Sequence, residues 1–174
     1  MSSRPEAAAW WSAIGSTSTS AAGPASGLCS TGLALLRRDG FASMDAGKEP
    51  GTLTTRPLGF QGGYLFVNAD TEKGELRAEI LDEKGEVIEP FTRARCVPIR
   101  ADKTLQGVTW TKDAGEPPGL IRRLAGQPVR FRFYLTAGRL YAFWVSHAES
   151  GASHGYVAAG GPNFKGPTDT VGRA

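Results

Sequence analysis

The stretch from Gln127 to Ser146 constrains the fold of this chain more than any other. It reads QPVRFRFYLTAGRLYAFWVS, and apolar residues recur at every second position on both sides of an Ala137-Gly138 step. This period of two is typical of β-strands, because successive side chains of a strand point to opposite faces. The stretch therefore predicts two antiparallel strands joined by a turn at Ala137-Gly138.

Each of these two strands has one face that is more apolar than the other. The first strand is expected to bury Val129, Phe131, Phe133 and Leu135 and to expose Arg130, Arg132, Tyr134 and Thr136. The second strand is expected to turn Tyr141, Phe143 and Val145 to the core and Leu140, Ala142 and Trp144 outward. Their outward side chains are then expected to share one surface.

Other segments carry the same signature, and helical periodicity is nearly absent. The segment YLFVNAD (64–70) has apolar side chains on both faces, which predicts a central strand covered on both sides. Residues 75–88 predict a hairpin that turns around Glu83, Lys84 and Gly85, and LIRRLAG (120–126) predicts one helical turn that Gly126 ends. The chain has 23 glycines and 11 prolines, which favours many turns and short strands. We predict an all-β fold, an antiparallel two-sheet β-sandwich of jelly-roll type.

The 174 residues are enough for one globular domain. Residues 1–30 are rich in Ala, Ser, Thr and Gly and predict a flexible arm. Residues 31–165 form the expected sandwich domain, and residues 166–174 are expected to be a frayed tail.

Composition excludes several classes of function. The net charge is +3 and the basic residues are spread along the sequence, so we expect no nucleic-acid partner. No run approaches the roughly 20 apolar residues of a spanning helix, so we expect no membrane insertion. Two histidines are too few for a three-histidine metal site, and the two cysteines, Cys29 and Cys96, form no CxxC pair and no Cys/His zinc pattern.

Six phrases of the sequence resemble a known protein region. They are LRRDGFASMDAG, GTLTTRPL, YLFVNAD, ELRAEILDEKGEVI, PVRFRFYLTAGRLYAFWVS and SGASHGYVAAGGP. Together they resemble the C-terminal β-sandwich region of bacterial glycoside hydrolase family 32-like proteins. The resemblance implies an accessory sandwich beside a five-bladed β-propeller that holds the catalytic carboxylates. It implies no catalytic residue in this chain, and it implies an extracellular or periplasmic location.

Exposed aromatic rings next to hydrogen-bonding side chains are what a carbohydrate-binding surface needs. Trp144 is the leading candidate ring, with Tyr134, Arg132 and Arg130 beside it on the expected outer surface. The alternative is that Trp144 is buried, as large aromatic side chains usually are.

Two loops add further candidates. His147, His154 and Tyr156 follow the strongest strand on a loop and are candidate carbohydrate contacts, while a divalent metal on the two histidines is disfavoured. Asp39, Asp45 and Glu49 form an acidic group that predicts either a structural calcium site or a solvated turn. No other cofactor is expected.

Three hypotheses follow for function. The first is a non-catalytic module that binds a polysaccharide or oligosaccharide by aromatic stacking. The second is a structural domain that docks on a β-propeller glycoside hydrolase. The third is a small autonomous carbohydrate-active enzyme, for which no pair of carboxylates is identified by the sequence.

Overall fold

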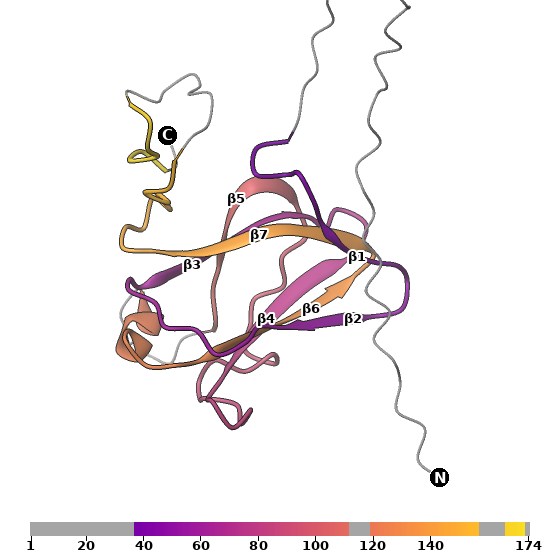
Figure 1. Cartoon of the computed structure of the whole chain (residues 1–174). Helices are drawn as coiled ribbons and strands as arrows, with labels where there is room; N and C mark the ends of the chain where they lie inside the picture. Colours follow the sequence, from indigo (N-terminus) through magenta and orange to yellow (C-terminus); the bar gives the residue numbers. More distant parts are fainter. Residues whose placement is uncertain (1–36, 112–118, 157–165, 173–174) are drawn as a thin grey trace, which may run out of the picture.

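The computed structural model describes residues 37–111, 119–156 and 166–172, so the predicted arm at residues 1–30 lies outside the described residues. Within the described part, the chain forms two antiparallel sheets packed face to face (Figure 1). The four-stranded sheet has the order β1 (Met44–Ala46), β7 (Gly138–Ser146), β3 (Tyr64–Asp70), β5 (Asp102–Val108). The three-stranded sheet has the order β2 (Gly51–Thr54), β6 (Arg130–Thr136), β4 (Glu75–Leu81). The predicted all-β, two-sheet class is confirmed.

The hydrophobic core lies between the sheets and follows the predicted alternation. Val129, Phe131, Phe133 and Leu135 are all buried, as expected for the inner face of β6. The ring of Phe131 packs on those of Phe60 and Phe143 at centroid distances of 5.7 and 5.8 Å. Aromatic packing of this kind joins β6 of one sheet to β7 of the other.

Strand β3 is covered on both faces, as its sequence predicts. It lies between β7 and β5, with Leu65 and Val67 in the core. On its outer face Phe66 is 3% exposed and Asn68 is fully buried. Asn68 accepts a hydrogen bond from Arg37 Nε and donates one to the carbonyl oxygen of Arg38, so residues 37–38 cover this face.

The predicted hairpin at Ala137-Gly138 is wrong. Strand β6 pairs with β2 and β4, whereas β7 pairs with β1 and β3, so the chain changes sheets at this point. Ala137 has a φ of 44°, and a Cβ at Gly138 would lie 2.7 Å from the carbonyl oxygen of Asp70. A tight turn with a close backbone approach lets the chain cross between layers. Alternation identifies the two strands but not their partners.

The predicted division of side chains in β7 is also partly wrong. The pairing with β3 shifts between Asn68 and Ala69, which pair with Ala142 and Leu140, so Tyr141 is left out of the ladder. Leu140 is therefore a core residue, while the ring of Tyr141 lies 4.6 Å from the guanidinium carbon of Arg37. Such a bulge reverses the alternation on one side of the extra residue.

The predicted turn after β4 is present, but its second arm is irregular. Gly85, with a φ of 92°, donates its backbone N–H to Asp82 at 3.1 Å, and Val87 forms an isolated bridge with Leu81. The following segment, residues 87–99, runs along the outer edge of β4. Its backbone contacts reach β4 at Ile80 and again at Leu76. This segment protects the edge of the three-stranded sheet.

The predicted helical turn is a short 3-10 helix, η1 (Leu120–Leu124), which Gly126 follows with a φ of 79°. It packs Ile121 and Leu124 into the core. Among the described residues, no helix has the length and apolar character to cross a membrane.

Residues 166–172 were expected to belong to a frayed tail, but they lie against the domain. Thr168 forms a bridge with Tyr156, and the side chain of Asp169 is buried. Arg38 near the start of the described chain forms an ion pair with Asp169 at 2.8 Å, so both ends of the domain meet here.

Candidate functional site

The outer surface of the three-stranded sheet gathers polar side chains from all three strands. We call it the β6 face. Outward positions on the strands and on the segment beside β4 contribute Thr52, Thr54, Glu75, Arg77, Glu79, Arg93, Arg100, Arg130, Arg132, Tyr134 and Thr136. Cross-strand pairs bring the long side chains together, with Glu79 opposite Arg132 and Arg77 opposite Tyr134. Arg130, Arg132 and Tyr134 therefore share the outer surface of β6, as the alternation predicts, and their contacts with carbohydrate stay a prediction.

Glu79 is the centre of this face. Its side chain is only 7% exposed, and both carboxylate oxygens have donors. Oε1 accepts from the Tyr134 hydroxyl at 2.6 Å and from Arg132 Nη1 at 3.0 Å, and Oε2 accepts from the backbone N–H of Arg93 at 3.3 Å. Such charge-assisted bonds fix the position of each partner.

The network also fixes Tyr134 in its protonated form. Burial raises the pKa of Tyr134 above its ordinary value of 10, and its hydrogen bond to the Glu79 carboxylate raises it further. The phenol thus remains a donor to Glu79 at neutral pH. The guanidinium carbon of Arg93 lies 4.2 Å from the centroid of the Tyr134 ring and covers one of its faces.

Arg132 spans two strands of the β6 face. Its Nε donates to Thr54 Oγ1 of β2 at 3.1 Å while its Nη1 bonds Glu79 of β4. The side chain is 30% exposed, so part of the guanidinium faces solvent. A guanidinium held at both sides is a preorganised hydrogen-bond donor for a ligand.

Trp144, the leading candidate ring, is on the other sheet. It belongs to β7 and points outward, since it pairs with Phe66, whose side chain lies on the outer face of β3. The structure therefore does not bring Trp144 together with Tyr134 and Arg132. Its place among the carbohydrate contacts stays a prediction, and the expected platform of the three residues is not formed, because β6 and β7 lie in different layers.

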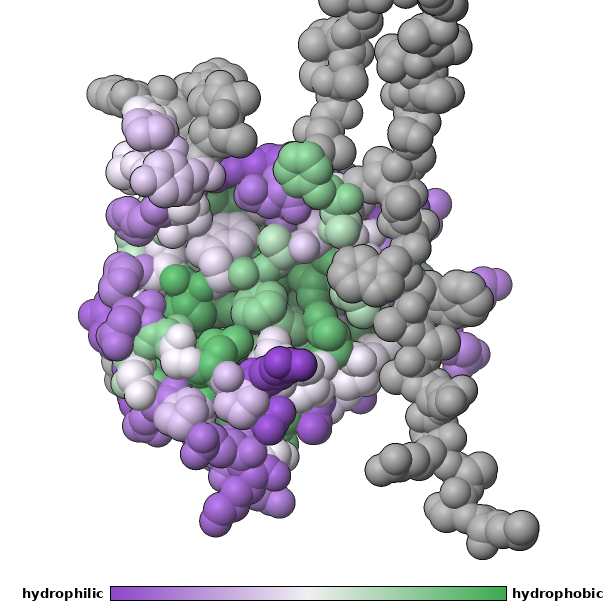
Figure 2. All heavy atoms as spheres, viewed as in Figure 1, coloured by the Kyte–Doolittle hydropathy of each residue, from purple (hydrophilic) through white to green (hydrophobic). Residues whose placement is uncertain are grey.

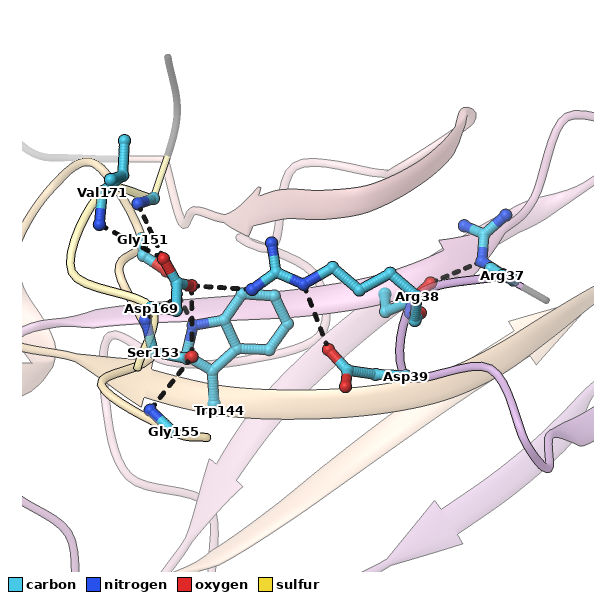
Figure 3. A network of polar contacts seen from close by, with 11 residues as sticks. Arg37, Arg38, Asp39, Trp144, Gly151, Ser153, Gly155, Asp169 and Val171 are labelled. Carbon is cyan, nitrogen blue, oxygen red and sulfur yellow. Dashed lines mark hydrogen bonds and ion pairs between the residues drawn. The ribbon is translucent and has the colours of Figure 1, made fainter. Parts of the chain in front are cut away.

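The indole of Trp144 already has contacts within the chain. It is half-buried and stacks on Phe66 at a centroid distance of 5.7 Å, and its Nε1 donates to the Gly151 carbonyl at 3.0 Å (Figure 3). A Cβ at Gly151 would lie 2.9 Å from the Phe66 ring, so glycine permits this close approach. These contacts hold the loop after β7 against the four-stranded sheet.

Asp169 also holds the loop after β7 in place, and the sequence did not point to this residue. Its side chain accepts from Ser153, Val171, Gly172 and Arg38 (Figure 3). Burial alone would raise its pKa, but the bonds from Gly172, Ser153, Arg38 and Val171 outweigh it and lower the pKa from 3.8 to about 2. Its sequence context, GPTDTVG, has no pattern that marks a buried carboxylate.

The other loop candidates are exposed. His147 and His154 both face solvent, and Tyr156 is 87% exposed. His154 has a φ of 54° and donates its backbone N–H to the Asp169 carbonyl. Their predicted contacts with carbohydrate stay predictions.

Two of the three acidic residues predicted to bind calcium, Asp39 and Asp45, have other partners. Asp39 pairs with Arg38 at 3.6 Å, and Asp45 accepts from Ser43 Oγ and pairs with Arg139. In the part of the chain that the structure describes, no three His, Cys, Asp or Glu side chains are grouped to hold a metal ion. Calcium at Asp39, Asp45 and Glu49 stays a prediction.

A pocket of about 350 Å³ lies where β3 begins and β5 ends. Its walls are mostly apolar side chains, among them Leu65, Val108 and Trp110. Gln106, Thr109 and Glu149 are among its few polar residues, and the Gln106 amide already donates to the Gly107 carbonyl. The pocket thus offers few hydrogen-bonding groups to a sugar, which has many hydroxyls.

No protein-family model, curated protein or solved structure matches this chain.

Proposed function

We propose that this protein is a non-catalytic carbohydrate-binding module and that its β6 face binds the sugar. The observation that carries the proposal is the fixed array of Thr54, Arg132, Tyr134 and Glu79 on an outer sheet surface. Hydroxyl, guanidinium and carboxylate groups are complementary to sugar hydroxyls. Because the protein holds them in place, binding does not have to order them.

The jelly-roll topology is part of this proposal. Strands alternate between the sheets along the chain, with β1, β3, β5 and β7 in one and β2, β4 and β6 in the other. Residues 87–99 bond the free edge of β4 at Ile80 and Leu76, where a fourth strand of that sheet would lie. Eight positions in two layers of four are typical of jelly rolls, a fold that lectin domains share.

The outer face of the four-stranded sheet is a weaker candidate. Residues 37–38 bury Asn68, and the loop that carries Gly151 packs on Phe66. The β6 face has no comparable cover among the described residues, and Thr52 and Thr54 are exposed on it. The expected partner is a polysaccharide or oligosaccharide, which a protein meets outside the cytoplasm; an extracellular or periplasmic location is therefore part of the proposal.

Arg132→Gln is expected to weaken glycan binding about tenfold or more. The variant loses the bonds that position the side chain between Thr54 and Glu79, and hydrogen bonds to charged groups contribute about 1.5–3 kcal/mol each. Affinity electrophoresis on a panel of glycans identifies a ligand, and calorimetry then compares the two proteins.

Arg139→Gln is the matched control, because Arg139 is an exposed arginine on β7 of the four-stranded sheet, away from the β6 face. Equal losses in both variants would count against the β6 face. Absence of retention on every glycan would overturn the carbohydrate-binding function itself.

A docking domain for a β-propeller glycoside hydrolase is the second candidate, and one observation favours it. Among the described residues, β1 pairs only with Gly138–Leu140, which leaves the rest of that β7 edge without a strand. Figure 2 shows apolar side chains gathered between the two sheets on one side of the molecule. The partly buried apolar residues of β1, β2, β7 and residues 58–60 that pack against the core are Ala46, Leu53, Leu58, Phe60, Phe143 and Val145. A free edge beside apolar side chains is a typical site for strand addition.

A further inference from the structure

The β6 face has more positive than negative groups. Its arginines are Arg77, Arg93, Arg100, Arg130 and Arg132, and its acidic residues are Glu75 and Glu79. Glu75 pairs with both Arg77 and Arg100, at 3.0 and 2.8 Å. Glu79 bonds Arg132, so no carboxylate of this face is left for Arg93 or Arg130. The face is complementary to a ligand with negative charge.

Arg93 is the most available of these cations. It is exposed, and among the described residues no carboxylate or carbonyl accepts a hydrogen bond from its guanidinium. Stacking on Tyr134, at 4.2 Å from the ring centroid, nevertheless holds it in place. Its planar fork of N–H donors is therefore oriented, and no acceptor in the described part of the chain occupies it. This geometry matches a carboxylate.

The contact between Arg93 and Tyr134 also affects how this face can recognise a sugar. Aromatic stacking on Tyr134 is obstructed on the ring face that Arg93 covers, and Tyr134 is the aromatic residue of β6 on this surface. Recognition by charge and hydrogen bonds thus replaces the stacking expected from the sequence.

From this geometry we infer that the β6 face binds a polysaccharide that carries carboxylates, a polyuronate, through Arg93 and Arg132. The inference rests on the proposed carbohydrate-binding function and names its substrate class. Arg93 takes the carboxylate of one sugar unit, while Arg132 and Thr54 bond hydroxyls or the carboxylate of a neighbouring unit.

The test compares polygalacturonate with the same polymer after reduction of its carboxyl groups. We expect retention of the protein in affinity electrophoresis on polygalacturonate, with retention falling as salt rises. The carboxyl-reduced polymer should retain it at least about tenfold more weakly. Arg93→Ala should weaken binding to oligogalacturonate by about tenfold in calorimetry.

Two further variants keep the test specific. Arg93→Lys keeps the charge but not the fork and should recover only part of the affinity. Arg139→Ala removes an exposed arginine from the four-stranded sheet and should leave binding unchanged. Thermal melting checks that each variant folds.

Each contrary outcome identifies what fails. Equal retention on the native and the carboxyl-reduced polymer would overturn the polyuronate inference and leave the carbohydrate-binding function standing. Retention as strong on dextran sulfate or an oligonucleotide would reduce the face to a general polyanion surface and would also overturn the inference. No retention on any glycan would overturn both the polyuronate inference and the proposed carbohydrate-binding function.

Discussion

Asp169→Asn is expected to lower the free energy of unfolding by about 2–3 kcal/mol at neutral pH. Asp169 is 1% exposed, and its carboxylate accepts from the backbone N–H groups of Ser153, Val171 and Gly172 and from Arg38. The asparagine side chain has the same shape but no charge. Its NH2 group would face the N–H groups that donate to the carboxylate, so some of these hydrogen bonds would be lost. Chemical denaturation monitored by tryptophan fluorescence measures the loss.

The same carboxylate predicts how the wild-type protein responds to acid. Its pKa in the folded state, about 2, lies below the ordinary 3.8, so its stabilisation is fully present above about pH 4. This stabilisation, roughly 2 kcal/mol, is lost as pH falls from 4 towards 2. The Asp169→Asn variant should lose less stability than the wild type over this interval.

Asp45→Asn provides the control for both measurements. Asp45 is 37% exposed and pairs with Arg139 at 3.6 Å, a surface contact that contributes little. If Asp169→Asn is as stable as Asp45→Asn, the end-to-end contact between residues 38 and 169 does not stabilise the domain.

Trp144→Ala is expected to lower the free energy of unfolding by about 2–3 kcal/mol, below the full cost of deleting a buried tryptophan because the ring is half-buried. The change removes the stacking on Phe66 and the hydrogen bond to the Gly151 carbonyl. The loop after β7 should therefore exchange its backbone amides faster, as hydrogen exchange can measure.

Trp144→Phe separates the two contributions. A phenyl ring keeps a stacking partner for Phe66 but has no donor for Gly151, so about 1 kcal/mol should be lost. Neither variant should change the affinity for glycans under conditions where the protein is folded. A large loss of affinity with unchanged stability would instead make Trp144 a binding residue, as the sequence predicts.

The strands were predictable from sequence because burial alternates with a period of two. Phe131 and Phe133 are buried and Arg132 is on the outer surface, as the pattern indicates. The pairing of strands was not predictable, because β6 and β7 look the same whether they form a hairpin or lie in different sheets. The bulge at Tyr141 has no local signal either, since it arises from the register with β3.

The residues of the candidate site that lie on one strand were predictable from sequence, whereas those that neighbouring segments contribute were not. Tyr134, Arg132 and Arg130 are found by alternation along one strand. Glu79 and Arg93 come from a strand and a segment whose neighbours are known only once the sheet is assembled. One signal in the sequence does point to Glu79. It is an acidic residue inside the strand ELRAEIL, opposite in charge to the arginines of β6.

Chemical-shift mapping of the labelled protein with oligogalacturonate tests the central claim most directly. We predict that the shifts concentrate on β2, β6 and β4, at Thr54, Glu79, Arg93, Arg132 and Tyr134. Shifts concentrated instead around Trp144 and Tyr156, with the β6 face unaffected, would contradict the account.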